Sequence, residues 1–210
     1  MMMKRFLMLW VMVLTCVCSF AQSFDYGATG GISLSCPQDV RSRFGFNVGV
    51  KGELAFSDAD SYLYLSTGLS FASRGWVSDI YTDAGDRRLD WKWDIYYMEL
   101  PAMLGVKYGL NDYSALSVEA GPYVAYKLWH DARSSLTDCY DMMNIDTDIP
   151  GCITRFDYGL KAYVGVDYGK WEVGVGCSFS LQKPVSEKYA YLANPKDRSV
   201  SLKLTYMFSR

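Results

Sequence analysis

The stretch from Arg155 to Leu181, RFDYGLKAYVGVDYGKWEVGVGCSFSL, consists of two alternating runs on either side of a short turn, YGKW at residues 168–171. In both runs aromatic and aliphatic residues occupy every second position, and glycine, serine and charged residues predominate between them. A period of two places successive side chains on opposite faces of a β-strand. The stretch therefore predicts a β-hairpin with one apolar face and one polar face.

The aromatic residues of this hairpin gather at the two ends of its apolar face. Phe156 and Tyr158 begin the face, Tyr168 and Trp171 flank the turn, and Phe179 stands near the far end. Two aromatic bands around an aliphatic band are typical of a transmembrane β-barrel. Glycine weakens a strand unless space is needed, so the glycine-rich face indicates a crowded interior. We therefore expect the apolar face to contact lipid and the polar face to line a lumen.

The same alternation recurs along the chain and predicts an all-β fold, an eight-stranded antiparallel up-and-down transmembrane β-barrel. The expected strands are Tyr26 to Leu34, Phe44 to Phe56, Leu63 to Arg74, Trp91 to Leu110, Leu116 to Leu128, Phe156 to Tyr168, Trp171 to Leu181 and Ser199 to Phe208.

The connections between these strands alternate between long and short. The long ones include Gly75 to Leu89, Trp129 to Thr154 and Gln182 to Asp197. Long external loops and short periplasmic turns are typical of outer-membrane barrels, so both termini are expected on the periplasmic side. Pro101 interrupts the fourth strand and predicts a local bulge, because proline has no N–H to donate.

The N-terminus has the pattern of an export signal. An apolar run from Phe6 to Val17 follows two cations, and small residues stand at Ser19 and Ala21. We expect a cleavable signal peptide at residues 1–21, followed by a barrel domain at residues 22–210.

Composition excludes two classes of protein. The 210 residues carry a net charge of -2, which gives no basic surface for nucleic acid. No stretch after the N-terminus has the roughly 20 apolar residues of a membrane helix. A membrane-spanning form would have to be a closed barrel, which satisfies every backbone hydrogen bond.

Several segments resemble a known family: YYMELPAMLGVKYGL from Tyr96, AGPYVAYKL from Ala120, FDYGLKAYVGVDYG from Phe156 and the terminal SLKLTYMF. They are similar to the PorT-like outer-membrane β-barrel family of Bacteroidota. The resemblance covers nearly all of the chain after the expected signal peptide. It implies an eight-stranded barrel like OmpX or the membrane domain of OmpA, and it implies no particular activity.

The polar faces of the predicted strands carry five lysines and six carboxylates. Buried charges persist when they are paired, and an eight-stranded barrel is just filled by its side chains. We therefore expect an ion-pair network that fills the lumen; a proton path or a small-ligand pocket is the alternative. The residues are Lys51, Glu53, Glu99, Lys107, Glu119, Lys127, Asp157, Lys161, Asp167, Glu172 and Lys203.

The chain contains one histidine, His130, next to Asp131 and close to Ser134 and Ser135. A Ser-His-acid hydrolase acting on lipid or peptide is therefore an alternative function. Catalysis would need an oriented base in contact with a nucleophile, and this spacing guarantees neither. We expect a solvated or interfacial histidine.

Cysteines and acidic residues in the longest loop give two further candidates. Cys139 and Cys152 would form a possible disulfide, which export permits, with Cys36 as a competing partner. Cys177 is expected to be a small lipid-facing residue. An acidic group in the loop lacks the glycine-centred spacing of a calcium site and predicts a solvated loop without a metal or other cofactor. That group is Asp141, Asn144, Asp146 and Asp148.

These observations together predict a non-enzymatic integral outer-membrane protein. Its barrel would be a scaffold in outer-membrane lipid, and its long external loops would bind an unknown surface or envelope partner. The alternatives are the hydrolase near His130 and a soluble lipocalin-like barrel with its aliphatic side chains inside.

Overall fold

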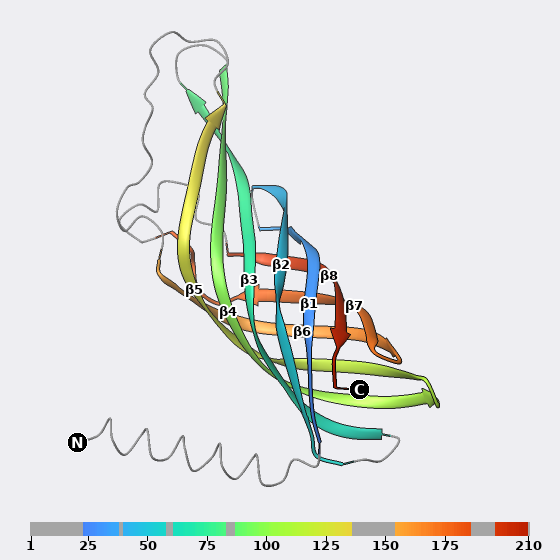
Figure 1. Ribbon diagram of the computed structural model, residues 1–210. Helices are drawn as coiled ribbons and strands as arrows, with labels where there is room; N and C mark the ends of the chain where they lie inside the picture. Colours follow the sequence, from blue (N-terminus) through green and yellow to red (C-terminus); the bar gives the residue numbers. More distant parts are fainter. Residues whose placement is uncertain are drawn as a thin grey trace, which may run out of the picture.

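In the computed structural model, eight strands form one closed barrel, in which each strand is antiparallel to the next (Figure 1). The ring closes between β8 and β1, with a register that runs from Gly27 opposite Met207 to Ser35 opposite Ser199. The predicted eight-stranded up-and-down barrel is confirmed. The strands are β1 Ser23–Ser35, β2 Arg41–Ala55, β3 Ser61–Thr82, β4 Arg87–Asn111, β5 Ser114–Ser135, β6 Phe156–Tyr168, β7 Trp171–Ser180 and β8 Arg198–Met207.

The structure describes residues 23–37, 40–57, 61–82, 87–135, 154–185 and 196–209. The expected signal peptide at residues 1–21, the possible disulfide between Cys139 and Cys152, and the acidic group from Asp141 to Asp148 lie outside these residues. Within the described part of the chain, no helix is long and apolar enough to cross a membrane.

The two faces of the barrel reverse the usual arrangement of a soluble protein. Val164 and Leu202 on the outer face are 50% and 51% exposed, whereas Glu119 and Glu172 on the inner face are almost completely buried. Large exposed apolar patches mark surfaces that meet another apolar phase. The lipocalin-like alternative, with aliphatic side chains inside, is therefore wrong.

Aromatic clusters flank the aliphatic belt at both ends of the barrel. At one end the rings of Tyr96 and Trp129 stack with centroids 4.7 Å apart, and Phe71 lies 5.5 Å from Trp129. At the other end the Trp171 ring lies 4.7 Å from that of Tyr206. These are the two aromatic bands expected where a barrel crosses the interfaces of a bilayer.

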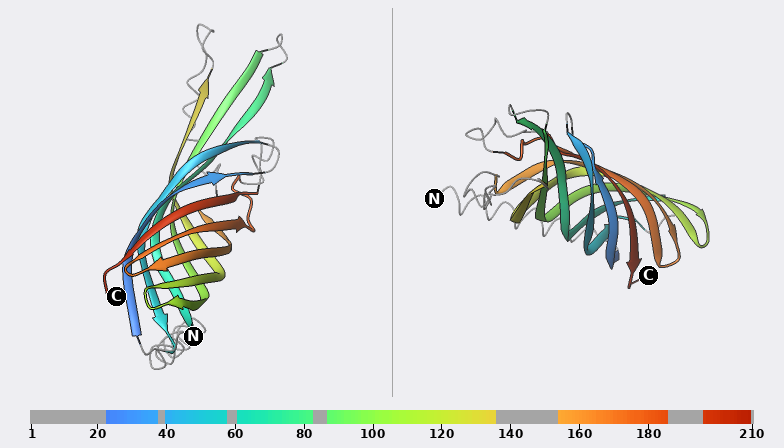
Figure 2. Two further views of the ribbon diagram at one scale, coloured as in Figure 1. Left: turned by 90° about the vertical axis from the view of Figure 1, so that its right-hand side faces the viewer. Right: turned by 90° about the horizontal axis from the view of Figure 1, so that it is seen from above.

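Strands β3, β4 and β5 continue beyond the rest of the ring (Figure 2). The predicted loop from Gly75 to Leu89 is wrong, because pairing of β3 with β4 continues to Thr82 opposite Arg87. Likewise, the first part of the predicted loop after Leu128 belongs to β5. Outside a bilayer a strand needs no continuous apolar face, so pairing persists after the lipid-facing alternation stops. We call this end the extended end and the opposite end the turn end.

The predicted bulge at Pro101 is also wrong. The register of β4 with β5 is the same on both sides of Pro101, which stands opposite Tyr123. Thr67 donates a hydrogen bond from its hydroxyl to the Pro101 carbonyl oxygen, at 2.9 Å. The register of these strands shifts instead between Tyr96 and Tyr97, beside Trp129, and between Gly109 and Asn111, next to the turn.

Two short turns at the turn end lie wholly within the described residues. Gly169 follows β6 at a φ of 56°, a conformation that L-residues with a side chain rarely adopt. Between β4 and β5, the Asn111 side chain accepts hydrogen bonds from the backbone N–H groups of Tyr113 and Ser114, at 3.0 and 2.8 Å. Such side-chain turns replace ladder bonds at the ends of strands.

Introducing arginine on the outer belt tests this assignment of faces. Val164→Arg should lower the free energy of unfolding in lipid vesicles by about 2–4 kcal/mol, because the charge loses its hydration in the bilayer. The control Leu110→Arg, beside the turn end, should cost only about 0–1 kcal/mol. Denaturant titrations give both values, and equal costs at the two depths would contradict the assignment.

Candidate functional site

The lumen holds two groups of buried charges. The Lys51 cluster lies toward the turn end and consists of Lys51, Glu53, Lys107, Glu119, Asp167 and Glu172. The Arg74 cluster lies toward the extended end and consists of Arg74, Glu99, Asp157, Lys161 and Asp197.

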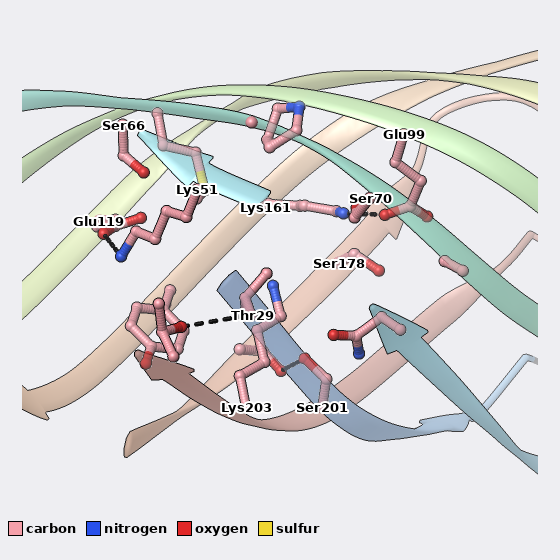
Figure 3. A pocket seen from close by; sticks show the side chains of 18 of the residues that line it. Thr29, Lys51, Ser66, Ser70, Glu99, Glu119, Lys161, Ser178, Ser201 and Lys203 are labelled. Atoms are coloured by element: carbon pink, nitrogen blue, oxygen red, sulfur yellow. Dashed lines mark hydrogen bonds and ion pairs between the residues drawn. The ribbon is translucent and has the colours of Figure 1, made fainter. Parts of the chain in front are cut away.

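Lys51 is the centre of the first cluster. Its Nζ lies 2.8 Å from Glu119 Oε1, 2.8 Å from Glu172 Oε1 and 3.0 Å from Glu53 Oε1. These side chains come from β2, β5 and β7, so one ammonium group joins three strands across the lumen. Figure 3 shows the contact between Lys51 and Glu119.

Lys107 extends the cluster toward the turn end. Its Nζ lies 2.9 Å from Glu53 Oε2 and 3.4 Å from Asp167 Oδ2. The same ammonium stands 4.9 Å from the ring centre of Tyr64, whose hydroxyl donates to Glu119 Oε1 at 2.8 Å. Cation–π contact and charge-assisted hydrogen bonds both strengthen when water is excluded.

A glycine makes room for this arrangement. Tyr64 is completely buried and stands opposite Gly105 in the register of β3 with β4. A Cβ atom at Gly105 would overlap the tyrosine ring. The glycines on the polar face predict a crowded interior. The Tyr64 ring, which lies directly against the backbone of Gly105, is an example.

Arg74 is the centre of the second cluster. Its guanidinium pairs with Glu99 and lies 2.9 Å from Asp157 Oδ2 and 3.2 Å from Asp197 Oδ2. Lys161 pairs with the other oxygen of Glu99, as Figure 3 shows. The planar guanidinium can serve several carboxylates at once, which suits it to such a buried centre.

Sequence reasoning missed two members of this cluster. Arg74 ends the third predicted strand but is absent from the predicted ion-pair network. Asp197 ends the predicted loop from Gln182. Its position, two residues before the inward Ser199, is the signal that could have identified it, because residues two apart share a face when a strand continues.

Two predicted lysines lie outside both clusters. Lys127 is half-buried on β5, and its backbone N–H donates to the Arg155 carbonyl oxygen at 2.7 Å. Lys203 stands 5.8 Å from the ring centre of Tyr163 and, among the described residues, has no carboxylate within ion-pair distance.

A cavity of about 80 Å³ separates the clusters from the hydroxyl-rich strands β1, β7 and β8. In its wall, register partners on neighbouring strands are joined: Thr205 donates to Thr29 at 3.0 Å, and the hydroxyls of Ser178 and Ser199 lie 2.6 Å apart. Figure 3 shows Thr29, Ser201 and Lys203 on the side facing away from the two ion pairs. The polar lining suits a few water molecules.

The two ends of the lumen differ. At the extended end, Trp76 and Trp93 stack with centroids 5.9 Å apart and, with other buried apolar side chains, cover the Arg74 cluster. At the turn end, a vestibule of about 530 Å³ reaches inward to Lys107 and Asp167. Water therefore approaches the charges from the turn end. The apolar cap consists of Trp76, Trp93, Ile95, Tyr97, Tyr123, Ala125 and Val185.

His130 belongs to the wall of this cap. It lies in β5 opposite Ile95, is half-buried, and stacks on Trp93 with ring centroids 6.3 Å apart. Asp131 follows it in the same strand, so the two side chains leave opposite faces. Ser134 and Ser135 also lie in β5, but their side chains are outside the described part of the structure.

The two cysteines in the described residues are free thiols. Cys36, the competing disulfide partner, follows β1. Cys177 stands opposite Ala162 and Val200 on the outer face, which is the lipid-facing place expected from its sequence position.

One group of carboxylates has the spacing of a metal site. Ligand oxygens of Glu53, Glu119 and Glu172 lie within 4.8 Å of one another. Lys51 Nζ, however, already contacts one oxygen of each. Its positive charge stands where a metal would bind.

Comparisons with known proteins agree with this architecture. A family model described as an outer membrane protein beta-barrel domain matches residues 20–184. No curated protein matches the chain.

Similar solved structures include three barrels with low sequence identity. The chain is 12% identical to Ail of Yersinia pestis, covering 89% of this chain and 100% of that one, with a TM-score of 0.39. It is 13% identical to the outer membrane enzyme PagL (88% and 99% covered, TM-score 0.48) and 12% identical to OprG of Pseudomonas aeruginosa (90% and 98%, 0.47). These similarities are too distant to indicate an activity.

Removing the Arg74 guanidinium tests how strongly the barrel depends on its buried charges. Arg74→Met should lower the free energy of unfolding by about 3–5 kcal/mol, because it leaves buried carboxylates without their cation. Arg43, whose side chain is 28% exposed and pairs with Asp94 at 2.6 Å, provides the control. Arg43→Met should cost about 0–1 kcal/mol in the same denaturant titration, and a similarly small effect at Arg74 would contradict the proposed importance of its cluster.

Proposed function

Because this chain belongs to the outer membrane protein β-barrel domain family, we propose that its barrel is a non-enzymatic scaffold that presents a binding surface outside the cell. The chain is an outer-membrane β-barrel protein, and outer-membrane lipid surrounds its belt. A place in the PorT-like branch of Bacteroidota and a signal peptide at residues 1–21 stay predictions.

The observation that carries the proposal is the extended sheet, the parts of β3, β4 and β5 beyond the ring. Pairing of β2 with β3 reaches only to Arg41 opposite Val77, and pairing of β5 with β6 only to Tyr126 opposite Phe156. Beyond these points, within the described residues, β4 lies between β3 and β5 and no other strand pairs with them. In the described part of the chain, the sheet therefore has two strand edges outside the belt.

Strand edges are suited to one kind of partner. An unpaired edge offers a row of N–H and C=O groups to an added strand, and side-chain contacts then supply specificity. The short turns at the opposite end support an external position for the extended sheet. We therefore assign the partner as an extended segment of a surface or envelope protein, in place of the loop-bound partner expected from sequence.

The surroundings of His130 support a non-enzymatic role. The imidazole stacks on Trp93 in the cap, and Asp131 leaves the opposite face of the strand. A hydrolase would need the acid, the histidine and a nucleophile in one chain of hydrogen bonds.

Replacing the histidine tests this role. His130→Ala should leave the biological phenotype unchanged. A loss of lipid or peptide hydrolysis in this variant would favour the enzyme.

Removing the ends of β3 and β4 tests binding at the β3 edge of the extended sheet. Val77 and Lys92 are register partners, so an Asn-Gly turn between them would replace residues 78–91 and close the hairpin. Trp76 and Trp93 stay, so the barrel should fold. A photo-cross-linking residue in place of Val77, where the pairing of β3 with β2 ends, should capture a discrete partner in intact cells. This adduct should disappear in the shortened protein.

A matched control distinguishes the contribution of the strands to capture from that of the hairpin tip. Thr82 and Arg87 are also register partners, so Asn-Gly in place of residues 83–86 changes the tip and keeps both strands. Capture should persist in this control. Capture that is lost with the tip alone, or unaffected by loss of the strands, would contradict edge binding.

A further inference from the structure

Three exposed cations stand where the apolar belt ends on β7 and β8. Arg198 begins β8 opposite Phe179, an exposed residue of the belt. Lys196 lies two residues before Arg198, and Lys183 lies two residues after Leu181, another exposed belt residue. Among the described residues, none of these cations has a carboxylate within ion-pair distance. We call Lys183, Lys196 and Arg198 the rim cations.

The acid between two of the rim cations fixes their direction. The Asp197 carboxylate lies inside the ring, 3.2 Å from the Arg74 guanidinium. The backbone N–H of Ser180 donates to the Asp197 carbonyl oxygen at 2.9 Å, so the pairing of β7 with β8 continues to this residue. Successive side chains of a paired strand leave opposite faces. Lys196 and Arg198 therefore point outward, away from the one acid that lies next to them in the chain.

Hydrogen bonds hold the backbone on both sides of Lys183. Before it, the N–H of Leu181 donates to the Tyr158 carbonyl oxygen at 2.9 Å. After it, the carbonyl oxygen of Pro184 accepts from the N–H and the hydroxyl of Thr154, at 2.8 and 3.2 Å. Because β7 pairs with β8, a residue just beyond the end of β7 lies beside the start of β8. The three cations therefore occupy one part of the rim.

The rim cations lie at the depth of lipid headgroups. Outward residues of β8 are apolar from Val200 to Tyr206, and Tyr206 packs on Trp171 in the aromatic band of the turn end. Arg198 is the next outward position beyond Val200, at the other end of the belt. Both β7 and β8 end short of the tips of β3, β4 and β5 (Figure 2), so the cations adjoin the bilayer and not the extended sheet. Charged side chains are costly in the hydrocarbon and tolerated at its edge.

This combination of charge and depth suits an anionic lipid. Basic clusters next to a membrane-spanning segment attract anionic headgroups. A phosphodiester headgroup carries one negative charge, whereas a phosphate monoester carries about -1.5 to -2 at neutral pH. Three unpaired cations in one part of the rim match the more highly charged group, because fewer lipids then neutralise them.

We propose that the rim cations bind a membrane lipid whose headgroup carries phosphate monoesters. The acyl chains of this lipid lie along the exposed aliphatic side chains of β7 and β8, and its phosphates contact Lys183, Lys196 and Arg198. The external position proposed above for the extended end places this lipid in the outer leaflet. The site shares no residue with the extended sheet, so one barrel can hold the lipid and a protein partner on different sides.

Lipid retention by the purified protein tests the site. The barrel is reconstituted in phosphatidylcholine with equal small amounts of lipid A and dephosphorylated lipid A, then extracted in mild detergent with a chelator of divalent cations. Mass spectrometry gives the ratio of the two glycolipids that stay bound. The wild type should retain lipid A preferentially. Arg198→Gln should lower the ratio about fivefold, the contribution of one cation near anionic headgroups, and removal of all three cations should abolish the preference.

Two variants control for charge and for its position. Arg198→Lys keeps a cation at the rim and should keep the preference for lipid A. Lys170→Gln removes an exposed cation from the turn between β6 and β7, at the other end of the belt, and should also keep it. Retention of dephosphorylated lipid A should be the same in every variant, which shows that the apolar belt is intact.

Three results would overturn the proposal. The first is a preference for lipid A that survives the loss of all three cations, and the second is an equal loss of preference in Lys170→Gln. The third is retention of phosphatidylglycerol, a phosphodiester, as strong as that of lipid A in a parallel reconstitution. The experiment uses neither cells nor a protein partner, and it does not depend on which side of the membrane the extended end occupies. Its failure is therefore distinct from a failure of partner capture at the extended sheet.

Discussion

The barrel depends on two buried cations, Lys51 and Arg74, each of which holds three carboxylates together inside the ring. An outer face committed to lipid forces the polar residues of every strand inward, and buried charges are tolerated only when paired. Each cation joins strands that are distant in the sequence. The ion pairs therefore fill the interior and determine which strand faces meet. Apolar side chains have this role in a soluble domain.

The two clusters give the ends of the molecule different properties. At the extended end, Trp76 and Trp93 cover Arg74, and the sheet beyond them needs no bilayer to stay paired. At the turn end, short turns leave a vestibule that leads to Lys107 and Asp167. The same scaffold thus has strand edges at one end and a vestibule that leads to buried charges at the other.

The alternation of residues was enough to predict eight strands, their faces and most inward charges, because lipid contact imposes a strict period of two. The prediction failed where the strands leave the lipid. From Gly75 to Leu89 the sequence has no lipid-facing pattern and predicts a loop, although the backbone stays paired. The partner of each charge could not be derived either, since it depends on register. Arg74 gathers acids from β4, from β6 and from the residue before β8, separations that no local pattern records.

The most direct test of a lumen filled by paired charges is electrical. An eight-stranded ring leaves space for little beyond its side chains, and the cavity of about 80 Å³ is covered at the extended end. The purified protein in planar lipid bilayers at neutral pH should therefore show no stable, stepwise ion conductance. Reproducible open channels under these conditions would contradict the account, because they would require a continuous water path past both Lys51 and Arg74.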